Sequence, residues 1–229
     1  TYALDAATGE MLWFAPMLSG SDVPPSVATI DGRPVAIAGP GESRDGGGDK
    51  TVYALDVETG RRRWTYRAWG GMDGAPTVAD IDGDGQAEIV VTSLADASLY
   101  ALRVEDGSLM WRYSIPETDA CTHYKNNWCI PTGEKHYHTA RAICKSFNSP
   151  LVVESDTDAG RFVIFGSNNG SLYILNGKTG DLVERVSLDG PIRGSPVVAC
   201  LNGDESASLV ATAGSTVVAL NIANGVPDL

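Results

Sequence analysis

Short runs of apolar residues, many of them β-branched or aromatic, recur along the whole chain, and turns rich in glycine, aspartate or asparagine separate them. Runs of about four to eight such residues between turns are typical of β-strands. Two further signals recur in step with the runs: a proline that opens one run of each group, and a Thr-Gly turn between two later runs. The pattern predicts an all-β chain whose short strands are grouped in fours.

The expected strands of each group are named A to D in chain order. Strand A follows the proline, which is tolerated at the first residue of a strand. Strand C holds the motif Tyr-Ala-Leu, and strand D follows the Thr-Gly turn. The predicted A strands are Val27–Ile30, Thr77–Ala79, Leu151–Val153 and Val197–Ala199, and the predicted B strands are Val35–Ala38, Glu88–Thr92, Phe162–Phe165 and Leu209–Thr212.

An eight-residue element formed by strand C and its turn is repeated along the chain. Its copies are Tyr2–Gly9, Tyr53–Gly60, Tyr100–Gly107 and Tyr173–Gly180, with a divergent copy at Val218–Gly225. A tryptophan stands four residues after the glycine in the first three copies. Units of four strands and about 45 residues match the blades of a β-propeller. A β-sandwich with coincidental similarity is disfavoured, because the copies agree in residue identity as well as in period.

The motif Tyr-Ala-Leu-Asp-x-x-Thr-Gly-x-x-x-Trp resembles the repeat of PQQ-like β-propellers, and the resemblance covers nearly the whole chain. That family includes quinoprotein alcohol dehydrogenases and the propeller lipoprotein of outer-membrane protein assembly, so the resemblance implies a fold and leaves the function open. In the family, the tryptophan docks one blade against the next. The resemblance implies this role for Trp13, Trp64 and Trp111, and it leaves the fourth interface in question because Glu184 replaces the tryptophan there.

The expected strands number 17: a C–D pair, three complete blades and a final A–B–C group. Because rings of PQQ-like propellers usually have about seven or eight blades, about four to five blades imply an arc of a larger ring, either a fragment of a longer protein or an assembly completed by a partner. We expect one propeller domain over residues 1–229. The distance from tryptophan to the next proline is twelve residues, except for 39 between Trp111 and Pro150, which predicts a loop insertion at 116–148.

Acidic residues alternate with other residues in Asp80–Glu88, a turn between expected strands A and B. Carboxylates occupy positions 1, 3, 5 and 9 of this loop, and the residue at position 7 would offer its backbone carbonyl. Intervening glycines permit a tight turn, and converging oxygen donors suit Ca²⁺, which accepts about six to eight of them. The alternative is a solvated acidic turn. The spacing resembles the calcium loop of FG-GAP-type propeller repeats, and the predicted ligands are Asp80, Asp82, Asp84, Gln86 and Glu88.

In an up-and-down meander, the A–B and C–D turns lie on one face of the propeller, and the B–C and D–A connections lie on the other. The calcium loop is an A–B turn, whereas the insertion is a D–A connection on the opposite face. The A–B turn of the next blade offers Glu154, Asp156 and Asp158 but has Phe162 at position 9, which predicts a partial site. The A–B turn that begins at Cys200 has lost most of its charge, and we interpret it as structural.

The insertion holds three of the four cysteines and all three histidines. Their spacing matches no common zinc or haem motif, so a disulfide that stiffens the loop is favoured over metal binding or free thiols, and it would indicate an oxidising compartment. We expect this disulfide to join two of Cys121, Cys129 and Cys144, with Cys121–Cys144 favoured because it closes the base of the insertion. Cys200 lies on the other face, too far away for a disulfide, and is predicted to be a free, buried thiol.

Other motifs point to structure rather than catalysis. The glycine-rich segment 41–50 lacks the Lys-Ser/Thr pair and the following helix of a P-loop. Asn169–Ser171 is a glycosylation sequon, but it equally fits a hairpin turn between strands B and C, which we favour. The sequence shows no nucleophile elbow, no metalloprotease motif and none of the catalytic motifs of quinoprotein enzymes.

The formal net charge of −12 and a pI of about 4.5 argue against nucleic acid as a partner, since its phosphates would be repelled. No apolar run approaches the length of a membrane span. The favoured function is a non-catalytic, calcium-binding scaffold, extracellular or periplasmic, that binds a protein or surface partner. The alternatives are a fragment of a PQQ-dependent oxidoreductase and a subunit of an extracellular assembly or filament that pairs through open strand edges.

Overall fold

The computed structural model describes residues 1–17, 20–21, 23–39, 49–72, 74–93, 97–116, 123–125, 128–130, 148–155, 160–201, 207–223 and 226–228. Within these stretches the backbone forms twenty β-strands and no helix. Every sheet joins strands that are consecutive in the chain, and all pairs are antiparallel. The all-β prediction is therefore confirmed, and each sheet is a meander.

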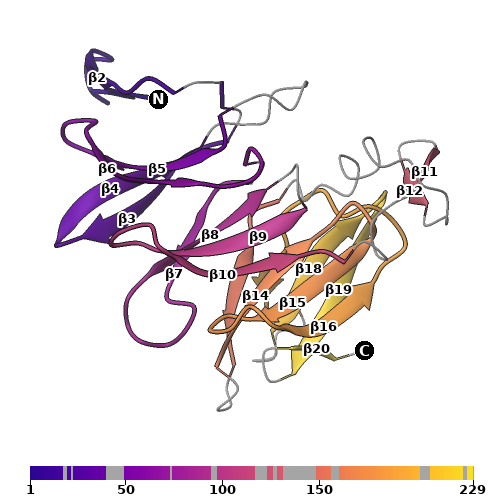
Figure 1. Cartoon of the computed structure of the whole chain (residues 1–229). Helices are drawn as coiled ribbons and strands as arrows, with labels where there is room; N and C mark the ends of the chain where they lie inside the picture. Colours follow the sequence, from indigo (N-terminus) through magenta and orange to yellow (C-terminus); the bar gives the residue numbers. More distant parts are fainter. Residues whose placement is uncertain are drawn as a thin grey trace.

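We call the N-terminal two-stranded sheet blade 1 and the four four-stranded sheets blades 2 to 5, in chain order. Figure 1 shows them following one another from the N-terminal hairpin to the C-terminal sheet. Their strands are β1 (Tyr2–Leu4) and β2 (Met11–Phe14) in blade 1; β3 (Ser26–Ile30), β4 (Arg33–Ala38), β5 (Thr51–Asp56) and β6 (Arg62–Arg67) in blade 2; β7 (Thr77–Ala79), β8 (Glu88–Ser93), β9 (Ser98–Arg103) and β10 (Leu109–Ser114) in blade 3; β13 (Leu151–Glu154), β14 (Arg161–Gly166), β15 (Ser171–Asn176) and β16 (Leu182–Ser187) in blade 4; and β17 (Val197–Ala199), β18 (Ser208–Ala213), β19 (Thr216–Ala223) and β20 (Val226–Asp228) in blade 5.

The predicted strands A and B lie within one or two residues of the observed ones, but the expected total of 17 strands was too low. Blade 5 has a fourth strand, β20, and the insertion contributes a separate hairpin of β11 (His123–Lys125) and β12 (Trp128–Ile130). β20 was missed because Pro227 argues against a strand in sequence. Since β20 is the edge strand of its sheet, the missing N–H of the proline is tolerated there.

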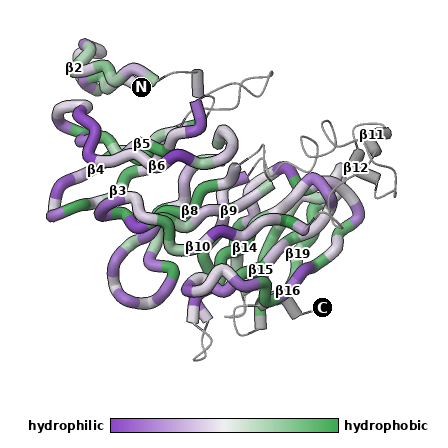
Figure 2. The backbone as a smooth tube through the Cα atoms, viewed as in Figure 1, coloured by the Kyte–Doolittle hydropathy of each residue, from purple (hydrophilic) through white to green (hydrophobic). Residues whose placement is uncertain are grey.

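The hydrophobic core lies between neighbouring blades, because each central strand is apolar on both faces. In β8, Ile89 and Val91 pack in one cluster with residues of blade 2, whereas Val90 packs in another with residues of blade 4. This division follows from the side-chain period of two in a strand. Figure 2 shows hydrophobic residues along these strands and hydrophilic residues in the turns.

The three tryptophans of the repeat dock each blade on the next, as predicted. The indole N–H groups of Trp13, Trp64 and Trp111 each donate a 2.7 Å hydrogen bond to a carbonyl in the C–D turn of the following blade. Each ring also lies against the turn glycine of that blade: a Cβ at Gly60, Gly107 or Gly180 would be 2.5 to 2.6 Å from an indole atom. The Thr-Gly turn is therefore the receptor for the indole of the preceding blade.

Blades 4 and 5 pack without such an indole. Glu184 occupies the position of the tryptophan and is half-buried. An aliphatic and aromatic cluster joins the two blades instead, and it includes Phe162, Ile164, Ile174 and Leu209, all buried. The fourth interface thus exists without an indole contact: it rests on this packing and on a 2.9 Å hydrogen bond from the Ser149 amide, before β13, to the Ser195 hydroxyl, before β17.

We expect Trp64→Ala to lower the free energy of unfolding by roughly 3–5 kcal/mol, because it removes a large side chain between blades 2 and 3 and leaves the Val104 carbonyl without its donor. Trp69→Ala is the matched control, since Trp69 is 69% exposed, and it should change stability by less than about 0.5 kcal/mol. Urea unfolding of both variants measures the difference. Equal losses in the two variants would contradict the docking role.

Candidate functional site

The candidate site is the loop between β7 and β8, Asp80 to Ala87, at the A–B end of blade 3. In Figure 1 this loop extends from the lower end of the sheet, whereas the β11–β12 hairpin lies at the upper right. The two therefore lie on opposite faces, as the meander predicts. The loop follows a short strand and precedes one of the most buried strands of the chain, β8, all of whose residues are buried.

Local hydrogen bonds shape this loop. Gly83 and Gly85 adopt φ values of +83° and +87°, which favour glycine. The amides of these two glycines donate to the Asp80 carboxylate, at 2.7 Å to Oδ1 and 2.9 Å to Oδ2. The Asp84 amide donates to Oδ1 of Asp82 at 3.1 Å. The alternation of aspartate with other residues therefore has a structural effect even without a cation: each carboxylate caps a tight turn.

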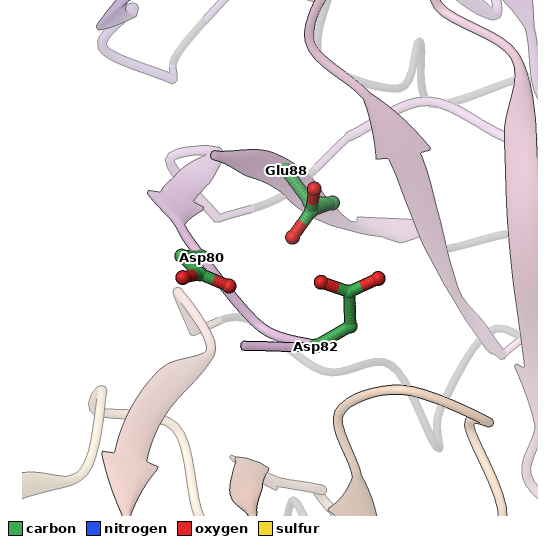
Figure 3. Close-up of side chains that lie close together, drawn as sticks. All are labelled: Asp80, Asp82 and Glu88. Atoms are coloured by element: carbon green, nitrogen blue, oxygen red, sulfur yellow. The ribbon is translucent and has the colours of Figure 1, made fainter. Parts of the chain in front are cut away.

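Three of the five predicted ligands converge. Asp80, Asp82 and Glu88 each offer a carboxylate oxygen, and these atoms lie within 4.8 Å of one another. Figure 3 shows the three side chains turned toward a common centre from the end of β7, the loop and the start of β8. Glu88 is only 1% exposed, and its Oε2 accepts the Ile81 amide at 2.9 Å.

The other two predicted ligands lie outside this group. The Asp84 carboxylate accepts the Gln86 amide at 2.8 Å and the Gln86 side-chain amide at 3.3 Å. Both residues are exposed. The structure thus brings together the carboxylates of positions 1, 3 and 9 and leaves that of position 5 outside the group, whereas the carbonyl of position 7 stays a prediction.

The surroundings of Glu88 and Asp80 shift the pKa values of these two carboxyl groups in opposite directions. Burial is the main cause that raises the pKa of Glu88 from 4.5 to about 7; the charges of the neighbouring aspartates act in the same direction, and the hydrogen bond from Ile81 opposes them. Burial also raises the pKa of Asp80. Hydrogen bonds from Arg161 and from the glycine amides outweigh this effect, so the pKa of its carboxyl group is lowered. Among the described residues, Asp80 is thus the member of the cluster with an ion pair to a positive charge, and the buried Glu88 has none.

Arg161, which was not predicted, supplies a positive charge from the neighbouring blade. Its Nη1 lies 2.5 Å from Oδ2 of Asp80, and its Nη2 lies 3.2 Å from Oε1 of Glu154. Arg161 is the first residue of β14 in blade 4. It directly precedes the predicted strand Phe162–Phe165, but its proximity to Asp80 depends on how blades 3 and 4 stack, which a repeat pattern does not reveal.

The loop is also locked into the interface between blades 3 and 4. Ile81 is fully buried in the same cluster as Trp111 and Tyr173. A Cβ at Gly177 would lie 2.1 Å from the Ile81 carbonyl oxygen, and the Gly177 carbonyl accepts the indole N–H of Trp111. The candidate site is therefore held by the same contact that docks the two blades.

Several other expectations concern this face. The proposed partial site cannot be assessed at Asp156 and Asp158, which lie outside the described residues; Glu154 pairs with Arg161 and Phe162 is buried. The prediction of a buried Cys200 was wrong, although its thiol is free. Cys200 directly follows β17, an edge strand of its sheet, and its side chain is exposed there.

On the opposite face, most of the expectations lie outside the described residues, including those for segment 41–48 and for the disulfide among Cys121, Cys129 and Cys144. The sequon is a hairpin turn, as favoured: the Asn169 side chain accepts the Ser171 amide at 3.0 Å and donates to the Tyr173 hydroxyl at 2.6 Å. In the part of the chain that the structure describes, no helix could cross a membrane.

The chain is similar to known proteins in both sequence and fold. The sequence model of the family described as outer membrane protein assembly factor BamB matches residues 1–124. BamB of Legionella pneumophila (strain Paris) is 28% identical over 172 residues, which are 67% of this chain and 43% of that protein. The chain thus spans less than half the length of this relative.

Two solved structures resemble the fold at low sequence identity. BamB from Moraxella catarrhalis aligns with a TM-score of 0.56 at 16% identity, over 93% of this chain and 55% of that one. Quinohemoprotein alcohol dehydrogenase from Comamonas testosteroni aligns with a TM-score of 0.61 at 15% identity, over 99% of this chain and 38% of that one. At such identities, these likenesses establish the β-propeller fold alone.

The raised pKa of Glu88 predicts a pH dependence of stability in the presence of a chelator. Between pH 4.5 and about 7, the folded protein holds a proton on Glu88 that the unfolded chain releases. The contribution of Glu88 to the free energy of unfolding therefore falls as pH rises through this interval. Glu88→Gln removes this titration and retains an acceptor for the Ile81 amide.

Thermal melts between pH 5 and pH 8 compare the two proteins. We expect the melting temperature of the wild type to decline relative to that of Glu88→Gln as pH rises. Because the other titrating groups are common to both proteins, melting curves that stay parallel across the range would contradict the raised pKa.

Proposed function

Because the chain belongs to the family of the outer membrane protein assembly factor BamB, we propose that it is a non-catalytic β-propeller scaffold that binds other proteins in the periplasm. The observation that supports this function best is the series of docked blades. Three indole–glycine contacts connect blades 1 to 4. Such a series fixes the spacing of the turns, which are the segments that a propeller offers to partners.

The periplasmic location follows from the same relationship. The curated relative is named as an assembly factor for outer membrane proteins, and a chain with this role would meet its partners at that membrane. We propose a protein partner rather than a small substrate. The described turns carry charged and polar side chains suited to a wet, polar protein interface.

We further propose that Ca²⁺ binds the β7–β8 loop through Asp80, Asp82, Asp84, Glu88 and the Gln86 carbonyl. The convergence of three carboxylates and the raised pKa of Glu88 support a cation there, because a divalent ion would relieve the repulsion among them. Hard oxygen donors favour Ca²⁺ over softer metals. Arg161 already neutralises part of the charge on Asp80, so the ion would share that carboxylate with it.

A second candidate function is that of a segment of a PQQ-dependent oxidoreductase. The alignment with a quinohemoprotein alcohol dehydrogenase over nearly the whole chain favours it. The candidate metal loop would then be unrelated to catalysis, since it is an A–B turn at the rim of one blade. A third candidate is a subunit of an extracellular assembly, for which the exposed Tyr2, Met11 and Phe14 of blade 1 offer apolar contact area.

Calcium binding is tested by melting the protein with and without a chelator. At a Ca²⁺ concentration tenfold above the Kd, linkage predicts about 1.4 kcal/mol of stabilisation. Asp82→Ala should abolish this gain. Asp106→Ala, which removes an exposed carboxylate from another turn of the same blade, should retain it. If Asp82→Ala still gains as much from Ca²⁺ as the wild type, the ligand assignment is wrong.

The scaffold role is tested by photo-crosslinking in a Gram-negative periplasm, with the crosslinker placed at exposed positions on turns of both faces. We expect crosslinks to outer-membrane assembly proteins from one face and not from the other. Purified protein incubated with PQQ and Ca²⁺ provides the competing test. A quinone absorbance band with dye-linked alcohol oxidation would favour the oxidoreductase. In light scattering, a molecular mass that increases with protein concentration would favour self-assembly.

A further inference from the structure

Four arginines converge at the turn end of blade 2. Arg33 follows the β3–β4 turn, and three consecutive arginines follow Gly60 in the β5–β6 turn. They border a pocket of about 310 Å³, which is lined by Arg33, Asp56, Thr59, Arg61, Arg62 and Arg63. This pocket lies outside the β7–β8 loop and shares no residue with it.

Two of these arginines are held in place by contacts within the protein. Arg62 donates from Nη2 to the Pro16 carbonyl at 3.1 Å, and its guanidinium carbon lies 5.0 Å from the centre of the Tyr53 ring. Arg63 forms an ion pair with Asp31 at 3.3 Å. These contacts orient the two guanidinium groups before any ligand arrives.

The other two arginines have charges that the described structure does not balance. Arg33 and Arg61 are exposed, and neither side chain makes an ion pair or hydrogen bond with another described residue. The carboxylate of the pocket, Asp56, interacts with the charge of Arg63, which is already paired with Asp31. Its Oδ1 accepts the Thr59 amide at 2.9 Å and the Thr59 hydroxyl at 2.7 Å. The hydroxyl bond, more than any other contact, lowers the pKa of Asp56.

The repeat does not require these arginines. The three residues between the turn glycine and the docking position are Glu10, Met11 and Leu12 in blade 1, Ser108, Leu109 and Met110 in blade 3, and Asp181, Leu182 and Val183 in blade 4. Four of the 17 lysines and arginines of a chain with net charge −12 therefore border one pocket, between two neighbouring turns of blade 2. A basic pocket on an acidic protein attracts an anion locally and repels it elsewhere.

We propose that this pocket binds an acidic peptide segment of a partner protein, with its carboxylates held by Arg33 and Arg61 beside the pre-oriented Arg62 and Arg63. Arginine forks bind carboxylates with two parallel hydrogen bonds. A short acidic segment interacts within about 10 Å, one Debye length, whereas a long polyanion such as nucleic acid would meet the negative remainder of the surface. The inference rests on the proposed protein-binding role in taking the anion to belong to a protein.

The test uses a fluorescent hexaglutamate peptide and the purified chain, with binding followed by anisotropy at low ionic strength. The double variant Arg33→Gln/Arg61→Gln should weaken binding about tenfold or more, since each lost guanidinium removes charge-assisted bonds. Arg67→Gln/Lys178→Gln is the matched control. It removes the same charge from exposed positions outside the pocket and should alter the Kd by less than about twofold.

Three outcomes would overturn the proposal: no peptide binding, equal weakening in both double variants, or pocket-dependent binding of inorganic pyrophosphate without binding of the peptide. Crosslinking separates this inference from the proposed function. A pocket variant that loses the peptide but keeps every periplasmic crosslink contradicts the pocket as a docking site and leaves the scaffold role intact. A chain that binds the peptide through the pocket but crosslinks to no assembly protein contradicts the scaffold role instead.

Discussion

The packing of an indole ring against a bare backbone turn is the contact on which the other features depend. A tryptophan at the edge strand of one blade needs both an acceptor for its N–H and a surface without a Cβ. The C–D turn of the next blade supplies both, through a carbonyl such as that of Val104 and a glycine such as Gly107. Each repeat contains both a turn and a tryptophan. Its turn therefore receives the indole of the preceding blade, and its own indole packs on the turn of the next blade.

The candidate metal loop depends on the same contact. Its buried Ile81 lies in the core that Trp111 closes, and its backbone approaches Gly177, the residue whose carbonyl receives that indole. Arg161 reaches Asp80 from the blade that Trp111 docks. The electrostatics of the loop are therefore set jointly by two blades, and a change at their interface would reach the carboxylates without touching them.

Much of this architecture could be predicted from the sequence, because strand alternation and the repeated turn are local properties. The carboxylates of Asp80, Asp82 and Glu88 were also identifiable, since their convergence needs only one loop. Contacts between segments that are distant in the sequence could not be predicted in this way. Examples are the ion pair of Arg161 with Asp80 and the position of Arg33 beside Arg61. Cys200 was placed correctly at the end of a strand, but its exposure depends on what covers the rim of its blade, which alignment to Asp80 does not convey.

The replacement of the fourth tryptophan by Glu184 has a consequence for cooperativity. In a structure of stacked units, stability is close to a sum of unit terms and nearest-neighbour coupling terms. Blades 1 to 4 are coupled by indole hydrogen bonds as well as by apolar packing, whereas blade 5 is coupled to blade 4 without an indole, by apolar packing and the hydrogen bond from Ser149 to Ser195. Because the interface between blades 4 and 5 lacks the indole contact, we expect blade 5 to open at a lower free energy than blades 2 to 4 and its amide hydrogens to exchange sooner than theirs.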